Sequence, residues 1–228
     1  MRILITGADL PLGAAVARAL CSEHELRLTG TEPLAPAGTE GCPYTPADLR
    51  EPDQVAPLVS GMDAIAHLAP HAAPVTPNAA AEKDALDHSG RGIYVLLHAA
   101  LKAGVGRVVM ASRLELMAAY PENYIVDPNW RPKPAPDAAS LAPFVAELTL
   151  REFVRAEEIV GVCLRLGDLG SGPADTTEAD AITAVTRALT MDLEGRKYRW
   201  WLYHIASTDR FPLANAAQPP LSFVRTGA

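Results

Sequence analysis

Two glycines and a leucine near the start of the chain form the first pattern that could do chemistry. The stretch "TGADLPLG" follows an apolar segment and keeps Gly7 and Gly13, with Leu10 between them. A glycine turn that opens a helix presents backbone N–H groups to an anion, and the helix dipole adds to the attraction. A leucine side chain covers part of such a site, and Pro11 restricts Leu10 to an extended conformation. The turn therefore keeps its shape but disfavours an anion.

Other residue groups that could carry catalysis or bind a metal are poorly arranged. His67 and His71 are four positions apart, but they fall on an expected strand end and a loop, so they would not share a helical face. A serine-hydrolase elbow requires GxSxG, whereas "DHSGRG" has Asp87 where the first glycine belongs. Neither a metal site nor a hydrolase is indicated.

Composition limits the classes of function. The 228 residues are 49% hydrophobic and 21% charged, which suits a soluble globular protein with a sizeable core. A net charge of -7 without a basic patch argues against partners such as nucleic acid or an anionic membrane. No 18-residue apolar run occurs, and "MRILITGA" is too short for a signal-peptide core. The three cysteines, Cys21, Cys42 and Cys163, lie far apart and form no CxxC pair. We therefore expect a reducing compartment and a cytoplasmic protein.

Short apolar runs alternate with longer amphipathic ones, which predicts parallel strands joined by crossover helices. Four prolines between Tyr120 and Pro136 predict a loop there. Strands are expected at 2–6, 25–30, 43–48, 62–69, 107–112, 160–167 and 198–207, and helices at 11–23, 52–60, 83–104, 140–158 and 177–192.

Six strands by residue 167 describe an α/β fold with a doubly wound parallel sheet of the Rossmann type. Residues 1–172 are expected to form this dinucleotide-binding-type domain. Residues 173–228 hold too little for a second core, so we expect a reduced C-terminal appendage in the same globule, a remnant of a substrate domain.

Five ordered blocks carry a resemblance to a known family: "ILITGADLPLGAAVARAL", "ADLRE", "MDAIAHLA", "AALKAGVGRVVMAS" and "CLRLGDLGSGP". The chain resembles the extended short-chain dehydrogenase/reductases, in the NAD-dependent epimerase/dehydratase branch, and "WLYHIAS" is similar to uronate dehydrogenases. The resemblance covers residues 1–172 clearly and 196–216 faintly. It implies NAD or NADP as the cofactor.

The cofactor positions that the resemblance implies are only partly kept. Gly7 and Gly13 serve the fold, whereas Leu10 replaces the glycine that lets backbone approach the pyrophosphate. The acidic residue that binds the adenosine ribose falls on Gly30, and Glu32 follows two positions later, either as a substitute or as an exposed loop residue. The remaining implied contacts are the adenine pair Asp48 and Leu49, of which Asp48 could instead cap the next helix, and Leu68 with Ala69.

The catalytic positions that the resemblance implies are all changed. The family's serine falls on Arg113, with Ser112 one position early, and the YxxxK tyrosine and lysine fall on Phe144 and Leu148. Phenylalanine cannot exchange a proton, and leucine has no charge to shift a pKa. An asparagine that supports the lysine in the family aligns with Ser89. No tyrosine of the chain has a lysine four residues later, so the dyad has no other place in the sequence.

Two residue types near these positions leave alternatives open. Arg113 could clamp a carboxylate or phosphate, or form a salt bridge to Glu115 or Glu147. Tyr120 and Tyr124 could supply a displaced acid or base, or simply pack.

Two hypotheses follow. The favoured one is a non-catalytic Rossmann protein that binds a small anionic ligand or a partner, as a homodimer or a heterodimer with an intact relative. Its interface would use "IYVLLHAAL" and "FVAELTL", about half of each being core. The alternative is an NAD(P)-dependent epimerase/dehydratase or sugar-acid dehydrogenase with a rearranged active site. The short C-terminal part favours the first hypothesis, because family members usually carry a longer chain there.

Overall fold

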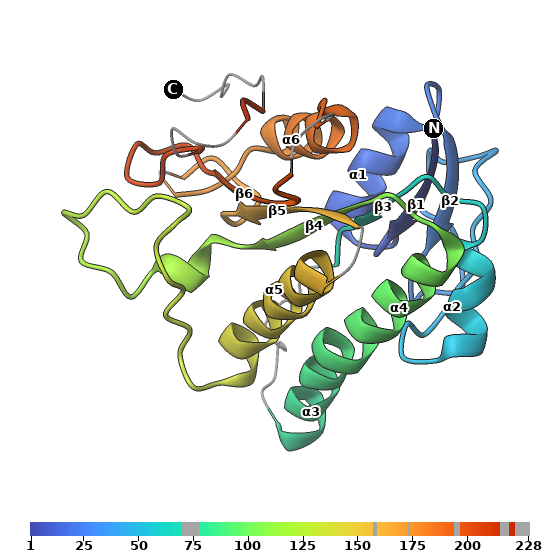
Figure 1. The fold of residues 1–228 in the computed structure, drawn as a ribbon, viewed down its shortest axis with the longest axis horizontal. Coiled ribbons are helices and arrows are strands. Elements are labelled where there is room, and N and C mark those ends of the chain that lie inside the picture. The colour runs from blue at the N-terminus through green and yellow to red at the C-terminus, as the bar shows by residue number, and fades with distance from the viewer. Residues whose placement is uncertain (70–77, 157–158, 173, 194–196, 215–218, 222–228) are drawn as a thin grey trace.

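Six parallel strands form one sheet, and they follow the apolar segments of the sequence. The computed structural model describes all residues except 70–77, 157–158, 173, 194–196, 215–218 and 222–228. The strand order is β2-β1-β3-β4-β5-β6 (Figure 1). The α/β doubly wound parallel sheet is therefore confirmed. The strands are β1 (Arg2–Thr6), β2 (Glu25–Thr29), β3 (Ala64–His67), β4 (Arg107–Arg113), β5 (Val160–Leu166) and β6 (Trp200–Ile205).

Helices cover both faces of the sheet. Figure 1 shows α1 (Pro11–Leu20) and α6 (Glu178–Thr190) above the sheet. On the other face lie α2 (Pro52–Val59), α3 (Ala79–Asp87), α4 (Ile93–Ala103) and α5 (Ala138–Ala156). Because helices cover both faces of the sheet, the central strands carry almost unbroken apolar residues rather than alternating ones.

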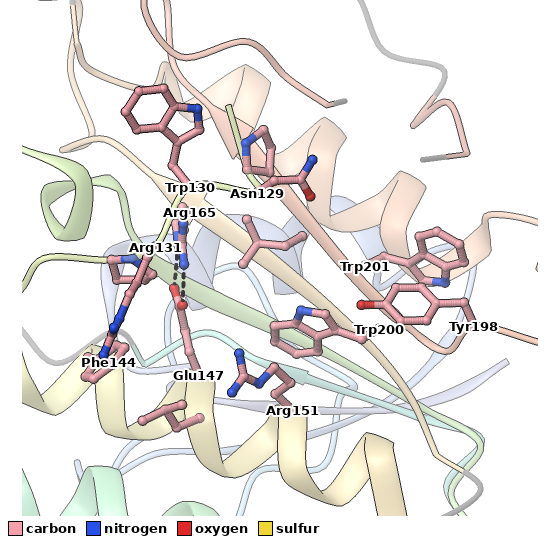
Figure 2. A pocket seen from close by; sticks show the side chains of 14 residues that line it. Asn129, Trp130, Arg131, Phe144, Glu147, Arg151, Arg165, Tyr198, Trp200 and Trp201 are labelled. Carbon is pink, nitrogen blue, oxygen red and sulfur yellow. Dashed lines mark hydrogen bonds and ion pairs between the residues drawn. The ribbon is translucent and has the colours of Figure 1, made fainter. Parts of the chain in front are cut away.

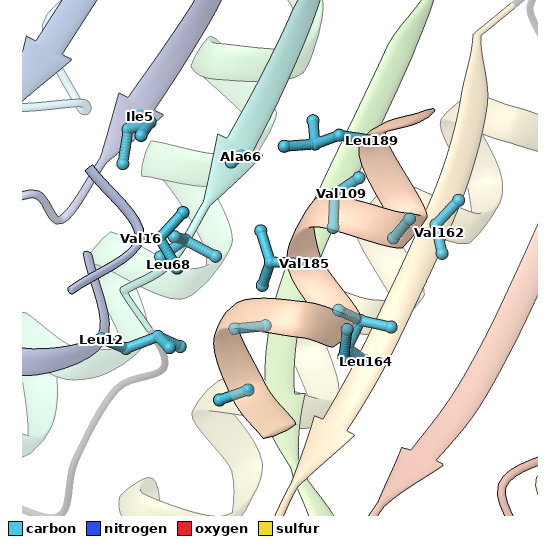
Figure 3. Close-up of a cluster of buried hydrophobic side chains, with 14 of the residues drawn as sticks. Ile5, Leu12, Val16, Ala66, Leu68, Val109, Val162, Leu164, Val185 and Leu189 are labelled. Atoms are coloured by element: carbon cyan, nitrogen blue, oxygen red, sulfur yellow. The ribbon is translucent and has the colours of Figure 1, made fainter. Parts of the chain in front are cut away.

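Each helical layer has its own buried cluster. Between the sheet and the pair α1 and α6, Val16 and Val185 pack against Ile5 and Leu164 (Figure 3). A second cluster joins the opposite sheet face to α2, α4 and α5. These two cores fix the strand ends, where loops carry the polar residues.

The fold corrects two expectations. The strand expected at 43–48 is only an isolated bridge between Tyr44 and Leu28, because Pro43 and Pro46 have no N–H group to extend the ladder. Five strands, not six, are complete by Leu166, and the sixth is β6. The helix expected over 83–104 is interrupted by a π-helical turn at His88–Gly92. The proline-rich segment at 120–136 contains no helix or strand, as expected.

Candidate functional site

The glycine turn is built by close packing between β1, α1 and the end of β3. Gly7 has φ +71°, and a Cβ there would lie 2.9 Å from the Cβ of Ala69. A Cβ at Gly13 would overlap the carbonyl oxygen of Gly7. Both glycines are thus required by the fold, as the sequence indicated.

Leu10 and Pro11 change the donors that this turn offers. Leu10 is the N-cap residue of α1 in an extended conformation, and its N–H donates to the oxygen of Gly7 at 3.1 Å. Pro11 is the first helical residue and has no N–H. The Leu10 side chain remains 39% exposed and lines a cavity beside the turn. Two of the N–H groups nearest the helix end are therefore lost to an incoming anion.

A carboxylate stands at the end of β2, although residue 30 is glycine. Asp9 reaches across from the turn, and its Oδ2 accepts the N–H groups of Thr31 at 2.7 Å and Glu32 at 3.0 Å. A Cβ added at Gly30 would overlap the carboxyl group of Asp9. Asp9 thus occupies the place of a side chain at position 30. The sequence reasoning missed it, although an acid in the turn together with a glycine after β2 is a readable signal.

The cavity beside the turn, here called the turn cavity, has a volume of about 280 Å³. Its walls come from the ends of β1, β2 and β3 and from α3. Among the residues expected to contact a cofactor, Gly7, Leu10, Leu49 and Ala69 line it. The expected contacts Gly13, Glu32, Asp48 and Leu68 are not part of its wall.

Asp48 is engaged by an arginine network. Arg50 Nη2 donates to Asp48 Oδ2 at 2.6 Å and Arg50 Nη1 donates to Asp84 Oδ1 at 2.6 Å. These hydrogen bonds, with the charge of Arg50, hold the pKa of Asp48 below its usual value. Asp48 does not cap α2, whose N-cap residue is Glu51. Asp84 itself lines the turn cavity, so a carboxylate faces the opening from α3.

Ser112 and Arg113 end β4 and point to opposite faces of the sheet, because successive strand residues alternate. The buried hydroxyl of Ser112 donates to Glu147 Oε1 on α5 at 2.6 Å. Arg113 instead contacts Glu115 at 3.0 Å and Asp168 at 3.2 Å. The salt bridge to Glu115 is confirmed, and the one considered with Glu147 is wrong because that carboxylate faces the other side.

Glu147 also forms a buried ion pair with Arg165. Arg165 donates from Nη2 to Glu147 Oε2 at 2.7 Å and from Nε to Oε1 at 2.9 Å. The side chains are only 3% and 6% exposed. Burial, with the nearby charge of Glu147, raises the pKa of the Cys163 thiol well above its usual value. Ser112, Glu147 and Arg165 thus form a buried polar cluster next to the catalytic positions that the resemblance implies. The spacing of these residues in the sequence did not predict the cluster.

Phe144 and Leu148 line a larger cavity, which we call the α5 cavity. It lies between α5, the segment 128–132 and the strands β5 and β6, and has a volume of about 670 Å³ (Figure 2). Phe144 also packs on a small cluster that includes Tyr120 and Phe211. No residue lines both the α5 cavity and the turn cavity in the part of the chain described. The tyrosine and lysine positions are thus apolar and separate from the turn.

The remaining sequence candidates take ordinary structural places. Tyr120 donates to the carbonyl of Arg131 at 2.7 Å, and both Tyr120 and Tyr124 make edge contacts with Trp130. His67 is buried with its Nδ1 2.6 Å from Thr6 Oγ1, while His71 lies outside the described residues. Ser89 is buried in the π-helical turn.

The donors around the turn do not fit a pyrophosphate. Leu10 and Pro11 withhold N–H groups that a pyrophosphate would need at the start of α1. The adenosine end is better kept, since Asp9 and Leu49 offer a carboxylate and an apolar contact. Within the described residues, no group of three or more His, Cys, Asp or Glu side chains could hold a metal ion. None of the described helices is long and apolar enough to cross a membrane.

Comparison with known proteins agrees with this geometry. Residues 3–201 match the model of the family described as "NAD dependent epimerase/dehydratase family". A curated relative, uronate dehydrogenase from Pseudomonas syringae pv. tomato, is 31% identical over 130 residues, which are 55% of this chain and 44% of the relative. The match thus spans less than half the length of that relative.

Solved structures share the fold. A mutated uronate dehydrogenase superposes with a TM-score of 0.81 at 25% identity, over 99% of this chain and 81% of that chain. Glucuronic acid dehydrogenase from Chromohalobacter salexigens gives 0.77 at 22% identity, over 94% and 80%. Uronate dehydrogenase from Agrobacterium tumefaciens, solved as a mutant with NAD, gives 0.75 at 23% identity, over 90% and 77%.

Proposed function

The chain belongs to the NAD dependent epimerase/dehydratase family, and we propose that within it the protein is a non-catalytic member that acts by binding. One observation carries the proposal. The positions of the family's proton-transferring pair hold Phe144 and Leu148, which line the α5 cavity as apolar side chains. A hydride transfer to or from a hydroxyl needs a group that gives or takes the hydroxyl proton.

The third catalytic position supports the same conclusion. Arg113 is tied to Glu115 and Asp168, and Ser112 is committed to Glu147. A serine that donates its one hydrogen to a buried carboxylate cannot donate it to a substrate oxygen. The changes occur together, while the core residues of the strands stay regular.

The proposed protein binds neither NAD nor NADP tightly. Leu10 covers the turn, Pro11 lacks an N–H, and two carboxylates face the turn cavity. These features weaken phosphate binding in particular, because the pyrophosphate carries the ligand's negative charge.

A second candidate is an NAD(P)-dependent epimerase/dehydratase or sugar-acid dehydrogenase with a rearranged active site. One observation favours it: Asp9 supplies a carboxylate at the end of β2 although Gly30 has no side chain. A carboxylate at that place can accept hydrogen bonds from a ribose. The uronate dehydrogenases among the relatives suggest a sugar acid as its substrate.

The proposed partner is a second copy of the chain or a catalytically intact relative, bound through α4 and α5. Ile93, Leu96 and Leu97 of α4 are buried in the core, whereas Tyr94 is 53% exposed. Tyr94 contacts Phe153 of α5 with ring centroids 5.7 Å apart. The outer surface of α4 and α5 thus carries aromatic side chains, which are enriched in protein interfaces. The three free cysteines support a reducing compartment such as the cytoplasm.

Calorimetric titration with NAD, NADH, NADP and NADPH tests the proposal, together with NADH formation in the presence of glucuronate. We expect no binding at about millimolar cofactor, which corresponds to a binding free energy of less than about 4 kcal/mol in magnitude. We also expect no NADH to form. Tight binding together with NADH formation would establish the second candidate instead. Tight binding without NADH formation would be consistent with a non-catalytic protein. It would refute the claim that Leu10 and Pro11 prevent the glycine turn from binding a dinucleotide.

A further inference from the structure

The α5 cavity collects an unusual set of side chains. The chain has three tryptophans, and all of them line this cavity: Trp130, Trp200 and Trp201. Phe144 and Tyr198 add two more rings. Figure 2 shows Trp200 and Tyr198 on one side of the cavity and the pair Glu147 and Arg165 on the other. Tryptophan and tyrosine are the side chains that binding sites favour most, because their rigid rings give a large contact area.

The aromatic wall is partly open to solvent. Tyr198 is 62% exposed, and its ring meets Trp201 edge-on with centroids 5.2 Å apart. Trp200 is half-buried at the start of β6. Leu148 and Leu202 complete the apolar surface between the rings. The face of a ligand ring can therefore stack on this wall without displacing core residues.

The charged side chains that line the α5 cavity are mostly positive. Arginines 131, 151 and 165 line the cavity, against the single carboxylate of Glu147. Arg165 is saturated by the bidentate contact with Glu147, so that pair forms a neutral end wall. Arg131 and Arg151 are the cations that remain.

These two arginines are weakly engaged among the described residues. Arg151 lies 3.7 Å from Glu152 Oε1, and both side chains are about half exposed. Arg155 competes for the same carboxylate with a hydrogen bond of 2.6 Å. For Arg131 the described residues provide no ion pair. An exposed ion pair such as Arg151 with Glu152 contributes little to the free energy of folding. A ligand anion can therefore take the place of Glu152 as the partner of Arg151.

The size of the cavity sets the size of the ligand. A volume of about 670 Å³ falls in the range of small-molecule sites, about 300–1,000 Å³. Asn129 and the hydroxyl of Tyr198 supply neutral polar groups at its edge, as shown in Figure 2.

We propose that the α5 cavity binds a small anion that carries one ring, either a flat aromatic ring or a sugar ring with an apolar face. The ring stacks on Trp200 and Tyr198, and the carboxylate or phosphate pairs with Arg151, which lies beside Trp200 in Figure 2. This gives the proposed binding function a ligand class and rests on that function. The apolar residues Phe144 and Leu148, in place of a reactive pair, then serve as contact surface for the ring.

Tryptophan fluorescence tests the inference, since every tryptophan lies at this cavity. The probes are glucuronate, a pyranose carboxylate, and adenosine 5'-monophosphate, an aromatic phosphate, each compared with its neutral counterpart glucose or adenosine. We expect at least one anion to quench the fluorescence saturably, with its neutral counterpart at least about tenfold weaker. The anion that binds identifies the ring type. No saturable quenching by either anion at about 10 mM, or equal binding of the neutral compounds, would overturn the inference.

Variants place the ligand in the cavity. Arg151→Gln is expected to weaken binding of the anion at least about tenfold, whereas Arg155→Gln, one turn further along α5 and outside the cavity, leaves it unchanged. Tyr198→Leu, at an exposed position that folding tolerates, is expected to weaken binding as well. Equal effects of the two arginine variants would contradict the inference. NAD is added to parallel glucuronate samples and NADH absorbance is recorded, so hydride transfer, which would refute the proposed function, is seen separately from ligand binding.

Discussion

The carboxylate of Asp9 fills the space beside Gly30 that a side chain at position 30 would need. Asp9 Oδ2 accepts the N–H and hydroxyl of Thr31 at 2.7 and 3.0 Å, and it accepts the N–H of Glu32. The negative charge at the end of β2 thus comes from the glycine turn rather than from β2 itself. The two positions depend on each other, since a Cβ at position 30 requires the Asp9 carboxylate to move.

This dependence predicts a strong coupling between two substitutions. Gly30→Ala should lower the free energy of unfolding by about 1–3 kcal/mol, because its Cβ overlaps Asp9. In the background of Asp9→Ala the same change should cost less by at least about 1 kcal/mol. Urea unfolding of the four proteins of the cycle measures the coupling. Additive effects would show that the Asp9 carboxylate does not occupy this space.

The buried pair of Glu147 and Arg165 predicts a large loss on removal of one partner. Glu147→Gln leaves the guanidinium of Arg165 without its counter-charge in a site where the side chains are 3% and 6% exposed. We expect a loss of about 3–5 kcal/mol in the free energy of unfolding. Glu152→Gln on the same helix, in an exposed pair with Arg155, should change it by less than about 1 kcal/mol. Comparable losses in the two variants would contradict the assignment.

Acid stability is expected to depend on Asp48. Hydrogen bonds from Arg50 hold its pKa below the ordinary 3.8 in the folded protein, so its ionised form favours folding. That stabilisation is present above the unfolded pKa and is lost as the pH falls through the folded pKa. The difference in unfolding free energy between wild type and Asp48→Asn should therefore shrink below about pH 4. A constant difference for Asp48→Asn across this pH range would disprove the linkage.

Restoring the reactive pair alone is not expected to restore catalysis. Phe144→Tyr with Leu148→Lys places both groups in the α5 cavity, which shares no described lining residue with the turn cavity. A hydride acceptor such as NAD, bound at the turn, would remain far from the proton-transfer pair. NADH formation from NAD and glucuronate should stay at background for this double variant. Clear turnover would mean that the two cavities join in solution.

Opening the turn should raise dinucleotide affinity. Leu10→Gly with Pro11→Ala removes the covering side chain and returns one backbone N–H to the start of α1. We expect NAD affinity to rise at least about tenfold over wild type in calorimetric titration. Leu10→Ala, which keeps Pro11, should give a smaller gain. Equal affinity in all three proteins would show that other groups, such as Asp84, control access.

The sequence by itself determined most of the strands and helices. Alternation of apolar runs is a local property, so it places β1, α1, β4 and β5 without knowledge of their neighbours. The steric demand at Gly13, set by Gly7, and the contact of Arg113 with Glu115 also span few residues. The short range explains why these predictions are confirmed.

Only the tertiary structure decided which distant polar groups meet. Asp9 reaches Thr31 across 22 positions, Arg50 reaches Asp84 across 34, and Ser112 reaches Glu147 across 35. Such contacts depend on strand order and on the rotation of α5 about its axis, and neither is encoded in local periodicity. The same holds for the tryptophans, because the segments at 130 and 200 become neighbours only when β6 adds to the edge of the sheet. Local patterns thus fix the elements, while packing of the elements fixes the sites.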